Sequence, residues 1–198
     1  VGGQTVERRV QLVAGSWSQT QELQPSNVSF SRFGSSIALR GTQLLVGAPE
    51  EDDPSGLSST GAAYLFSWDG AIWNEVPRFL PPAPKDDDRF GYDLDVRDDL
   101  VAISVPYFDP SIYVKDAGTA WLFRRRNPQQ EWSVDQQLVR SAAEGYDALG
   151  GDVDLGDDVV ALGAPSARTA AGTDSGAIDL YDVAEIVLTI TPNAPAAG

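Results

Sequence analysis

The chain has 198 residues, with 29 acidic and 14 basic side chains and therefore a net charge of −15. It contains no cysteine and no histidine, which excludes disulfides, zinc–sulfur sites, imidazole metal ligands and the Ser-His-Asp and Cys-His arrangements of hydrolases. The acidic excess argues against nucleic-acid binding, because that function needs a basic surface to neutralise phosphates. A bound metal would have to accept oxygen ligands, as calcium and magnesium do.

No apolar run approaches the roughly 20 residues that a membrane helix requires, so we expect no membrane insertion. The chain begins at Val1 without an initiator methionine, and we expect a mature or trimmed product.

Three landmarks recur along the chain in a fixed order: an aromatic residue or leucine before glycine, an apolar run that ends in proline, and a Gly-Ala or Gly-x-Ala start to a run that ends in an aromatic. The landmarks are Phe33-Gly34, Pro49 and Gly61; Phe90-Gly91, Pro106 and Gly118; and Leu149-Gly150, Pro165 and Gly176. The first landmark precedes the proline by 16 residues in all three cases, and the proline precedes the glycine by 12, 12 and 11. A tryptophan leads each unit, which gives three repeats at residues 17–72, 73–131 and 132–183.

Each unit is predicted to form four short antiparallel strands. In the second unit, residues 92–96 alternate in polarity, residues 100–105 form an apolar run typical of a strand covered on both faces, and residues 118–123 and 132–139 follow. A repeated sheet of this kind cannot bury both of its faces alone, so stacked neighbours must cover it. The fold class is therefore predicted to be all-β, built from β-propeller blades of four antiparallel strands.

The order Phe-Gly followed by Val-Gly-Ala-Pro in residues 33–49 resembles the FG-GAP repeat, over about residues 17–183. This family forms the propeller of integrin α subunits, and the tryptophan-led spacer is more similar to its bacterial secreted members. The resemblance implies a secreted or cell-surface scaffold for binding or adhesion, and not an enzyme. The calcium loops of integrin-type repeats have no room here, since the corresponding turns at residues 40–42, 97–99 and 156–158 are too short to wrap a cation.

Three units cannot close a ring that takes about four to eight blades. We expect residues 5–24 to supply the outer two strands of a preceding blade and residues 185–191 the last strand of the third, so that residues 1–183 form about three and a half blades. Residues 184–198 are expected to hold that final strand and a Pro/Ala-rich linker. A protein partner or a second copy would complete the propeller.

Antiparallel alternation places the long loops together at one end of the blades, where ligand-binding residues usually concentrate. The predicted ligand-binding residues in these loops are Glu50, Glu51, Asp52, Asp53, Tyr107, Phe108, Asp109 and Tyr113. A solvated run of charges, and aromatic side chains that pack on their own blade, are the alternatives.

Two aspartate pairs, Asp93 with Asp95 and Asp152 with Asp154, each lie on one side of a predicted innermost strand. Buried carboxylates need a partner, so the four residues predict either a cation site, with calcium possible, or hydrogen bonds to water and neighbouring backbone. Two other functions remain open. One is a structural subunit of a surface layer or filament that assembles through blade faces, and the other is a carbohydrate-binding or carbohydrate-cleaving propeller that uses axial carboxylates such as Asp93 with Asp152.

Overall fold

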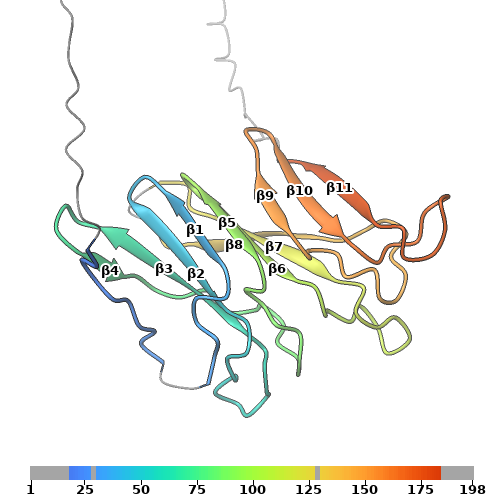
Figure 1. The fold of residues 1–198 in the computed structure, drawn as a ribbon, viewed down its shortest axis with the longest axis horizontal. Helices are drawn as coiled ribbons and strands as arrows, with labels where there is room; N and C mark the ends of the chain where they lie inside the picture. Colours follow the sequence, from blue (N-terminus) through green and yellow to red (C-terminus); the bar gives the residue numbers. More distant parts are fainter. Residues whose placement is uncertain (1–17, 28–29, 128–129, 184–198) are drawn as a thin grey trace, which may run out of the picture.

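The computed structural model describes residues 18–27, 30–127 and 130–183, and this part of the chain forms eleven strands in three antiparallel sheets (Figure 1). Blade 1 consists of β1 (Ile37–Arg40), β2 (Gln43–Ala48), β3 (Ala62–Trp68) and β4 (Trp73–Glu75). Blade 2 consists of β5 (Leu94–Arg97), β6 (Leu100–Val105), β7 (Thr119–Arg124) and β8 (Ser133–Leu138). Blade 3 consists of β9 (Val153–Leu155), β10 (Val159–Ala164) and β11 (Ala177–Asp182).

The strands of each sheet follow one another in chain order, and every neighbouring pair is antiparallel. The prediction of an all-β fold made of propeller-like blades is confirmed. The predicted fourth strand of blade 3, with the rest of residues 184–198, lies outside the described residues. Across the described part, no helix has the length and apolar character that crossing a bilayer would need.

Two of the three hydrophobic clusters lie between the blades, and the third lies on the outer face of blade 1, where Leu23 and Phe33 pack on β2 and β3. Blade 1 contributes Leu45, Ala63 and Leu65 to one cluster, which packs against Phe90, Val101, Ile103 and Phe123 of blade 2. A second cluster joins Ala120 and Leu122 of blade 2 to Val153, Leu155 and Leu162 of blade 3. All six residues of β6 are buried, as expected for a central strand covered on both faces. Burial of a blade therefore depends on its neighbours.

A Phe/Leu-Gly turn at the start of each of the later blades inserts beside the third strand of the blade before it. Phe90 forms an isolated parallel bridge with Gly61, and Leu149 forms the same bridge with Gly118. The Phe90 N–H donates to the Thr60 carbonyl at 2.9 Å, and the Leu149 N–H donates to the Ala117 carbonyl at 3.0 Å. These hydrogen bonds explain why the landmark recurs at a fixed spacing.

Gly91 shows why glycine follows the large side chain in this turn. Its φ is +85°, and a Cβ built there would lie 2.4 Å from the Ala62 carbonyl oxygen. Only a residue without a side chain tolerates both this backbone conformation and this close approach.

Residues 18–27 form no strand and run beside the outer strand of blade 1 (Figure 1). The Gln21 side-chain amide exchanges two hydrogen bonds with the backbone of Trp73, at 3.0 and 3.1 Å, and Ser26 donates to the Glu75 carboxylate. The prediction of strands from a preceding blade is therefore wrong for residues 18–24, and residues 5–17 lie outside the described part. The reason is local: this polar segment holds a single apolar anchor, Leu23, and a side chain makes the bonds that a paired strand would make.

Candidate functional site

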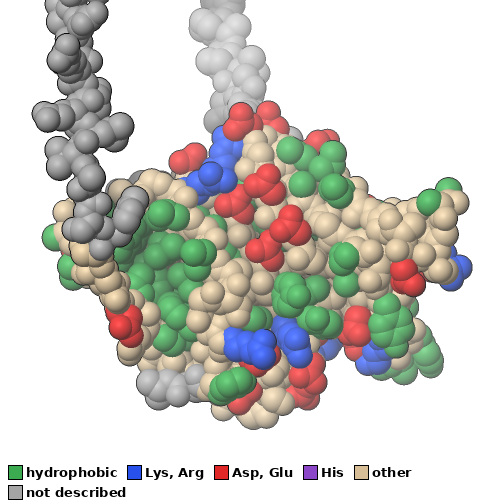
Figure 2. Space-filling model, viewed as in Figure 1, with side chains coloured by type: hydrophobic (Ala, Val, Ile, Leu, Met, Phe, Trp, Pro, Cys, Tyr) green, Lys and Arg blue, Asp and Glu red, His purple; other side chains and the backbone are tan. Residues whose placement is uncertain are grey.

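The long loops gather at one end of the blades, and the short hairpin turns gather at the other (Figure 1). Residues 49–61, 106–118 and 165–176 connect the second and third strands of each blade at this end, and residues 76–93 and 139–152 connect successive blades there. Figure 2 shows basic and acidic side chains interleaved with hydrophobic ones along this end. It is therefore a surface of mixed charged and hydrophobic character.

Asp109 holds the base of the loop in blade 2. Its Oδ1 accepts the Asp116 N–H at 2.8 Å, and its Oδ2 pairs with the Lys115 ammonium group. Partial burial raises the pKa of Asp109, but the hydrogen bonds from Lys115 and from the Asp116 backbone outweigh it, so the pKa is lowered overall. Lys85 reaches from the preceding interblade loop to the Asp109 carbonyl oxygen. The predicted ligand residue Asp109 thus positions its own loop.

The three predicted aromatic residues of this loop divide into two groups. Phe108 packs on the core between blades 1 and 2, with the Lys85 ammonium 4.6 Å from its ring centroid. Tyr107 lies under the Arg89 guanidinium, at 4.8 Å. Tyr113 is 89% exposed, and its neighbour Ile112 is 78% exposed. Ile112 has no distinguishing mark in the sequence, and it becomes a candidate only because a bridge between Ser111 and Val114 turns the loop back on itself at that point.

A second loop touches the first at this end. The Tyr146 N–H donates to the Lys115 carbonyl at 2.6 Å, and the Tyr146 side chain is 64% exposed. We call Ile112, Tyr113 and Tyr146 the loop-tip patch.

The acidic loop of blade 1 is occupied by internal contacts. Glu50 forms an ion pair with Arg32 at 3.1 Å, and Asp52 accepts the Ser59 N–H at 2.9 Å. Asp53 accepts the Ser55 N–H at 2.7 Å, and hydrogen bonds from Ser55 lower its pKa. These carboxylates shape the loop that carries them.

Glu51 is a correction to the predicted ligand-binding set. It is 2% exposed, and its carboxylate accepts hydrogen bonds from the Tyr64 hydroxyl at 2.6 Å and the Asn27 amide at 2.9 Å and pairs with Arg78. Burial, followed by the hydrogen bond to Glu51, raises the pKa of Tyr64 to about 12. Glu51 is therefore a structural residue. Alignment of the three units could have predicted that Glu51 is buried, since Glu51 occupies the position of the apolar residues Phe108 and Ala167.

Asp93 and Asp95 bind the backbone of the next blade. Asp93 Oδ2 accepts the Val153 N–H at 2.7 Å, and Asp95 Oδ2 accepts the Leu155 N–H at 2.9 Å. Burial raises the pKa of Asp93, and the neighbouring Asp152 carboxylate adds to the rise against the backbone hydrogen bonds. Of the two alternatives for the buried pair, the structure thus shows the backbone partners.

Asp152 and Asp154 occupy the equivalent positions on β9, where both are exposed. Figure 2 shows acidic side chains gathered over the region of β5 and β9. Within the described residues, no three carboxylates converge closely enough to hold a metal ion, so the four aspartates do not form the predicted cation site there.

Asp88 is a buried acid that the sequence did not single out. It is 3% exposed and lies near Lys85, Asp109 and Asp116. Burial raises its pKa to about 6. Its position two residues before Phe90 matches those of Ser31 and Asp147 in the other units, both also buried, so the repeat itself marks this as a buried polar position.

Comparison with known protein families gives a match to the model described as the FG-GAP repeat, over residues 17–66. No curated protein matches the chain significantly. The matched residues include the first Phe/Leu-Gly turn, β1, β2 and most of β3. The chain therefore contains an FG-GAP repeat at residues 17–66, followed by two units built on the same order of strands.

Proposed function

We propose that the chain is a non-enzymatic binding module of a secreted or cell-surface protein, and that it engages a protein ligand through the loop-tip patch. FG-GAP repeats are typical of extracellular and surface proteins and are typically non-enzymatic, which supports this class of function. The observation that carries the proposal is the exposure of Ile112 and Tyr113 at the tip of a loop whose base is fixed.

The base of the loop is held from several directions, which matters for binding. Asp109 ties the two arms of the loop together through Lys115 and Asp116, and Lys85 joins them to the interblade loop. A tip on such a base loses little conformational freedom when it binds, so less of the interaction energy is spent on ordering it. Exposed aromatic residues on rigid supports are frequent anchors of protein interfaces.

The surroundings indicate the chemistry of the ligand. An isoleucine and two tyrosines form the patch, while lysine and aspartate side chains stand at its base. This arrangement fits a partner surface with an apolar depression and a polar rim, as in ordinary protein interfaces.

The test uses arrays of extracellular proteins and of glycans, probed with the purified chain. We expect binding to one or more proteins, and we expect the double variant Ile112→Ser/Tyr113→Ser to lose at least about tenfold in affinity, or roughly 1.4 kcal/mol. The matched control is Ile72→Ser/Val134→Ser, which removes two exposed apolar side chains near the short-turn end of the blades, away from the loop end. Equal binding by the tip variant, or no binding to any arrayed protein, would contradict the proposal.

Two alternatives differ in their support. The carbohydrate-cleaving alternative needs two carboxyls at a set separation with one free to act as an acid, and Asp93 already accepts the Val153 N–H. The alternative of a subunit that assembles through blade faces is favoured by a separate observation, the exposed apolar side chains of β1 in blade 1 and β11 in blade 3.

A further inference from the structure

The contact between neighbouring blades occurs twice in the chain and has the same parts each time. The earlier blade offers a recess beside its third strand, and the later blade inserts its Phe/Leu-Gly turn there. The Arg89 N–H donates to the Ser59 carbonyl at 3.1 Å, and the Ala148 N–H donates to the Asp116 carbonyl at 3.0 Å, so even the residue before the turn is bonded alike. The two contacts define what any further contact of this kind requires.

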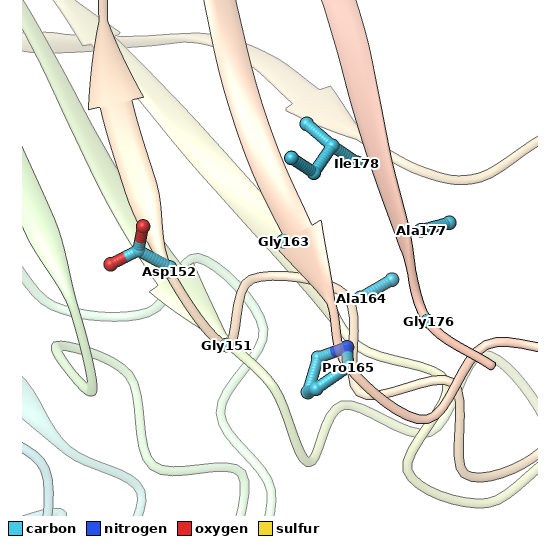
Figure 3. A pocket seen from close by; sticks show the side chains of 8 residues that line it. All are labelled: Gly151, Asp152, Gly163, Ala164, Pro165, Gly176, Ala177 and Ile178. Atoms are coloured by element: carbon cyan, nitrogen blue, oxygen red, sulfur yellow. The ribbon is translucent and has the colours of Figure 1, made fainter. Parts of the chain in front are cut away.

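Among the described residues, none places a Phe/Leu-Gly turn in the recess of blade 3. A hollow of about 420 Å³ is lined by Gly151, Asp152, Gly163, Pro165, Gly176 and Ile178, from the beginning of β9, the end of β10 and the beginning of β11 (Figure 3). A Cβ built on Gly61, the equivalent of Gly176, would lie 2.1 Å from the Phe90 carbonyl oxygen of the next blade. The nearest atom to such a Cβ at Gly176 is the Pro165 oxygen of its own blade, at 3.2 Å.

Apolar side chains on the third strand of blade 3 are exposed because the described residues place no blade over them. Ile178 and Leu180 are 73% and 69% exposed. Their equivalents are Ala63 and Leu65 in blade 1 and Ala120 and Leu122 in blade 2, and these four are all at most 2% exposed because a following blade covers them. Blade 3 thus carries apolar side chains at the positions that a following blade covers in blades 1 and 2.

Blade 1 presents the complementary half. Its turn has the same backbone conformation as that of blade 2, with φ +92° at Gly34 against +85° at Gly91, but a Cβ at Gly34 would have no neighbour within 4 Å. Ile37 and Leu39 are 69% and 59% exposed. Their equivalents, Leu94 and Val96 in blade 2 and Val153 and Leu155 in blade 3, are at most 7% exposed.

Polar groups at the two faces match as well. Asp93 and Asp95 of blade 2 accept the N–H groups of Val153 and Leu155 of blade 3. Asp152 and Asp154 occupy the same positions on the open side of blade 3, and Ile37 and Leu39 occupy the positions of Val153 and Leu155 in blade 1. Arg32 and Arg40 of blade 1 are ion-paired within the chain with Glu50 and Asp95, and Asp157 pairs with Arg97 of blade 2. The polar groups offered on the open side of blade 3 are therefore Asp152 and Asp154.

We propose that the open face of blade 3 docks blade 1 of a second copy of this chain, with the Phe33-Gly34 turn of that copy seated in the hollow beside Gly176. In this contact the Phe33 N–H donates to the Ser175 carbonyl, and the Ile37 and Leu39 N–H groups donate to Asp152 and Asp154, as their equivalents do inside the chain. The contact is head-to-tail, so it either closes a ring or continues as a filament. The described blades of two copies joined at both ends number six, within the range of about four to eight that closes a propeller.

The experiment is sedimentation velocity on the full chain over a nanomolar-to-micromolar range of concentration. We expect the unchanged chain to form dimers or larger species. Two double variants each place charge on one exposed face: Ile37→Asp/Leu39→Asp on blade 1 and Ile178→Asp/Leu180→Asp on blade 3. Each should sediment as a monomer by itself, because an unpaired carboxylate in an apolar contact is strongly unfavourable.

Mixing the two variants is the decisive step, because each retains the half that the other lacks. We expect an equimolar mixture to give a 1:1 dimer that grows no further. The matched control, Ile112→Asp/Tyr113→Asp, removes an equally exposed apolar pair from the loop-tip patch and should assemble as the unchanged chain does. Near-UV circular dichroism establishes that each variant is folded.

Three results would overturn the proposal: a monomer at every concentration, assembly that survives both face variants, or dissociation by the loop-tip control. None of them decides whether the loop-tip patch binds a ligand, and loss of ligand binding in the loop-tip variant leaves the assembly result unchanged, so the two proposals fail separately.

Discussion

At the scale of single residues, several acidic side chains of this protein bind its own backbone. Asp93, Asp95, Asp52 and Asp109 each accept at least one main-chain N–H. A carboxylate that accepts such bonds is stabilised in its charged form, so a large acidic excess is compatible with a compact chain. The negative charge thus has a structural use beyond solubility.

The burial of Asp88 yields a prediction about pH. Because its pKa is about 6 in the folded chain and ordinarily 3.8, the folded state binds more protons than the unfolded state between these two values. The stabilisation from protonated Asp88 is complete below about pH 4 and is lost as pH rises through about 6. Asp88→Asn should therefore raise the free energy of unfolding near neutral pH by about 2 kcal/mol and leave it unchanged near pH ~4.

Urea denaturation at the two pH values measures this difference. Asp87→Asn, the change of an exposed neighbour, is the control for a general effect of net charge. If both variants respond alike at both pH values, the burial of Asp88 is not the cause.

At the scale of elements, the interblade turn is specified by main-chain atoms. Gly34 and Gly91 have nearly the same φ, but only Gly91 has a neighbouring carbonyl where a side chain would stand. The pair therefore separates the cost of the backbone conformation from the cost of crowding.

We predict that Gly34→Ala lowers the free energy of unfolding of the monomeric chain by about 1 kcal/mol, which is the conformational cost alone. Gly91→Ala should lower it by about 3 kcal/mol or more, since the new methyl group also pushes against Ala62. Chemical denaturation at a concentration where the chain is monomeric measures both. Equal losses would show that the turn does not set the distance between blades 1 and 2.

The landmarks of the sequence predicted the blades correctly because each landmark marks a backbone requirement that recurs. The long-loop end was predictable too, since it follows from antiparallel alternation. Other features depend on which groups face each other across blades: the burial of Glu51 beside Arg78, and the N–H partners of Asp93 and Asp95, which come from residues 60 positions away. Strand periodicity within one unit does not indicate which groups face each other across two blades. Comparison of the units does indicate that Glu51 lies at a buried position.

At the scale of the whole molecule, stability is distributed unevenly along a row of three blades. Blade 2 is covered on both faces, and blade 3 has one exposed face. The outer face of blade 1 is exposed at β1 but covered over β2 and β3 by Leu23, Phe33 and Trp73. In a repeat array each unit is stabilised chiefly by its neighbours, so the end units open more readily than the middle one.

Amide hydrogen exchange should show this order. We predict the slowest exchange in β6 and β7, and faster exchange in β1 and β11, whose side chains are largely exposed or only half-buried. Raising the protein concentration should slow exchange in β1 and β11 and leave β6 as it is, because the proposed contact covers only the outer faces. Uniform protection across the three blades would contradict the neighbour-dependent account of stability.

The Phe/Leu-Gly turn has a consequence for how specifically blades recognise one another. Hydrogen bonds between main-chain atoms are the same for every amino acid. An interblade contact made of them therefore does not distinguish one blade from another. Within a single polypeptide the covalent chain fixes the order of the blades, so the turn does not need to be specific for one neighbour. Between separate polypeptides the order is not fixed in this way, and exclusive pairing depends on the few variable side chains of the contact. These are Ile37 and Leu39 on one side and Asp152, Asp154, Ile178 and Leu180 on the other. Substitution of those side chains is thus the simplest route by which related proteins with this turn would become mutually compatible or mutually exclusive.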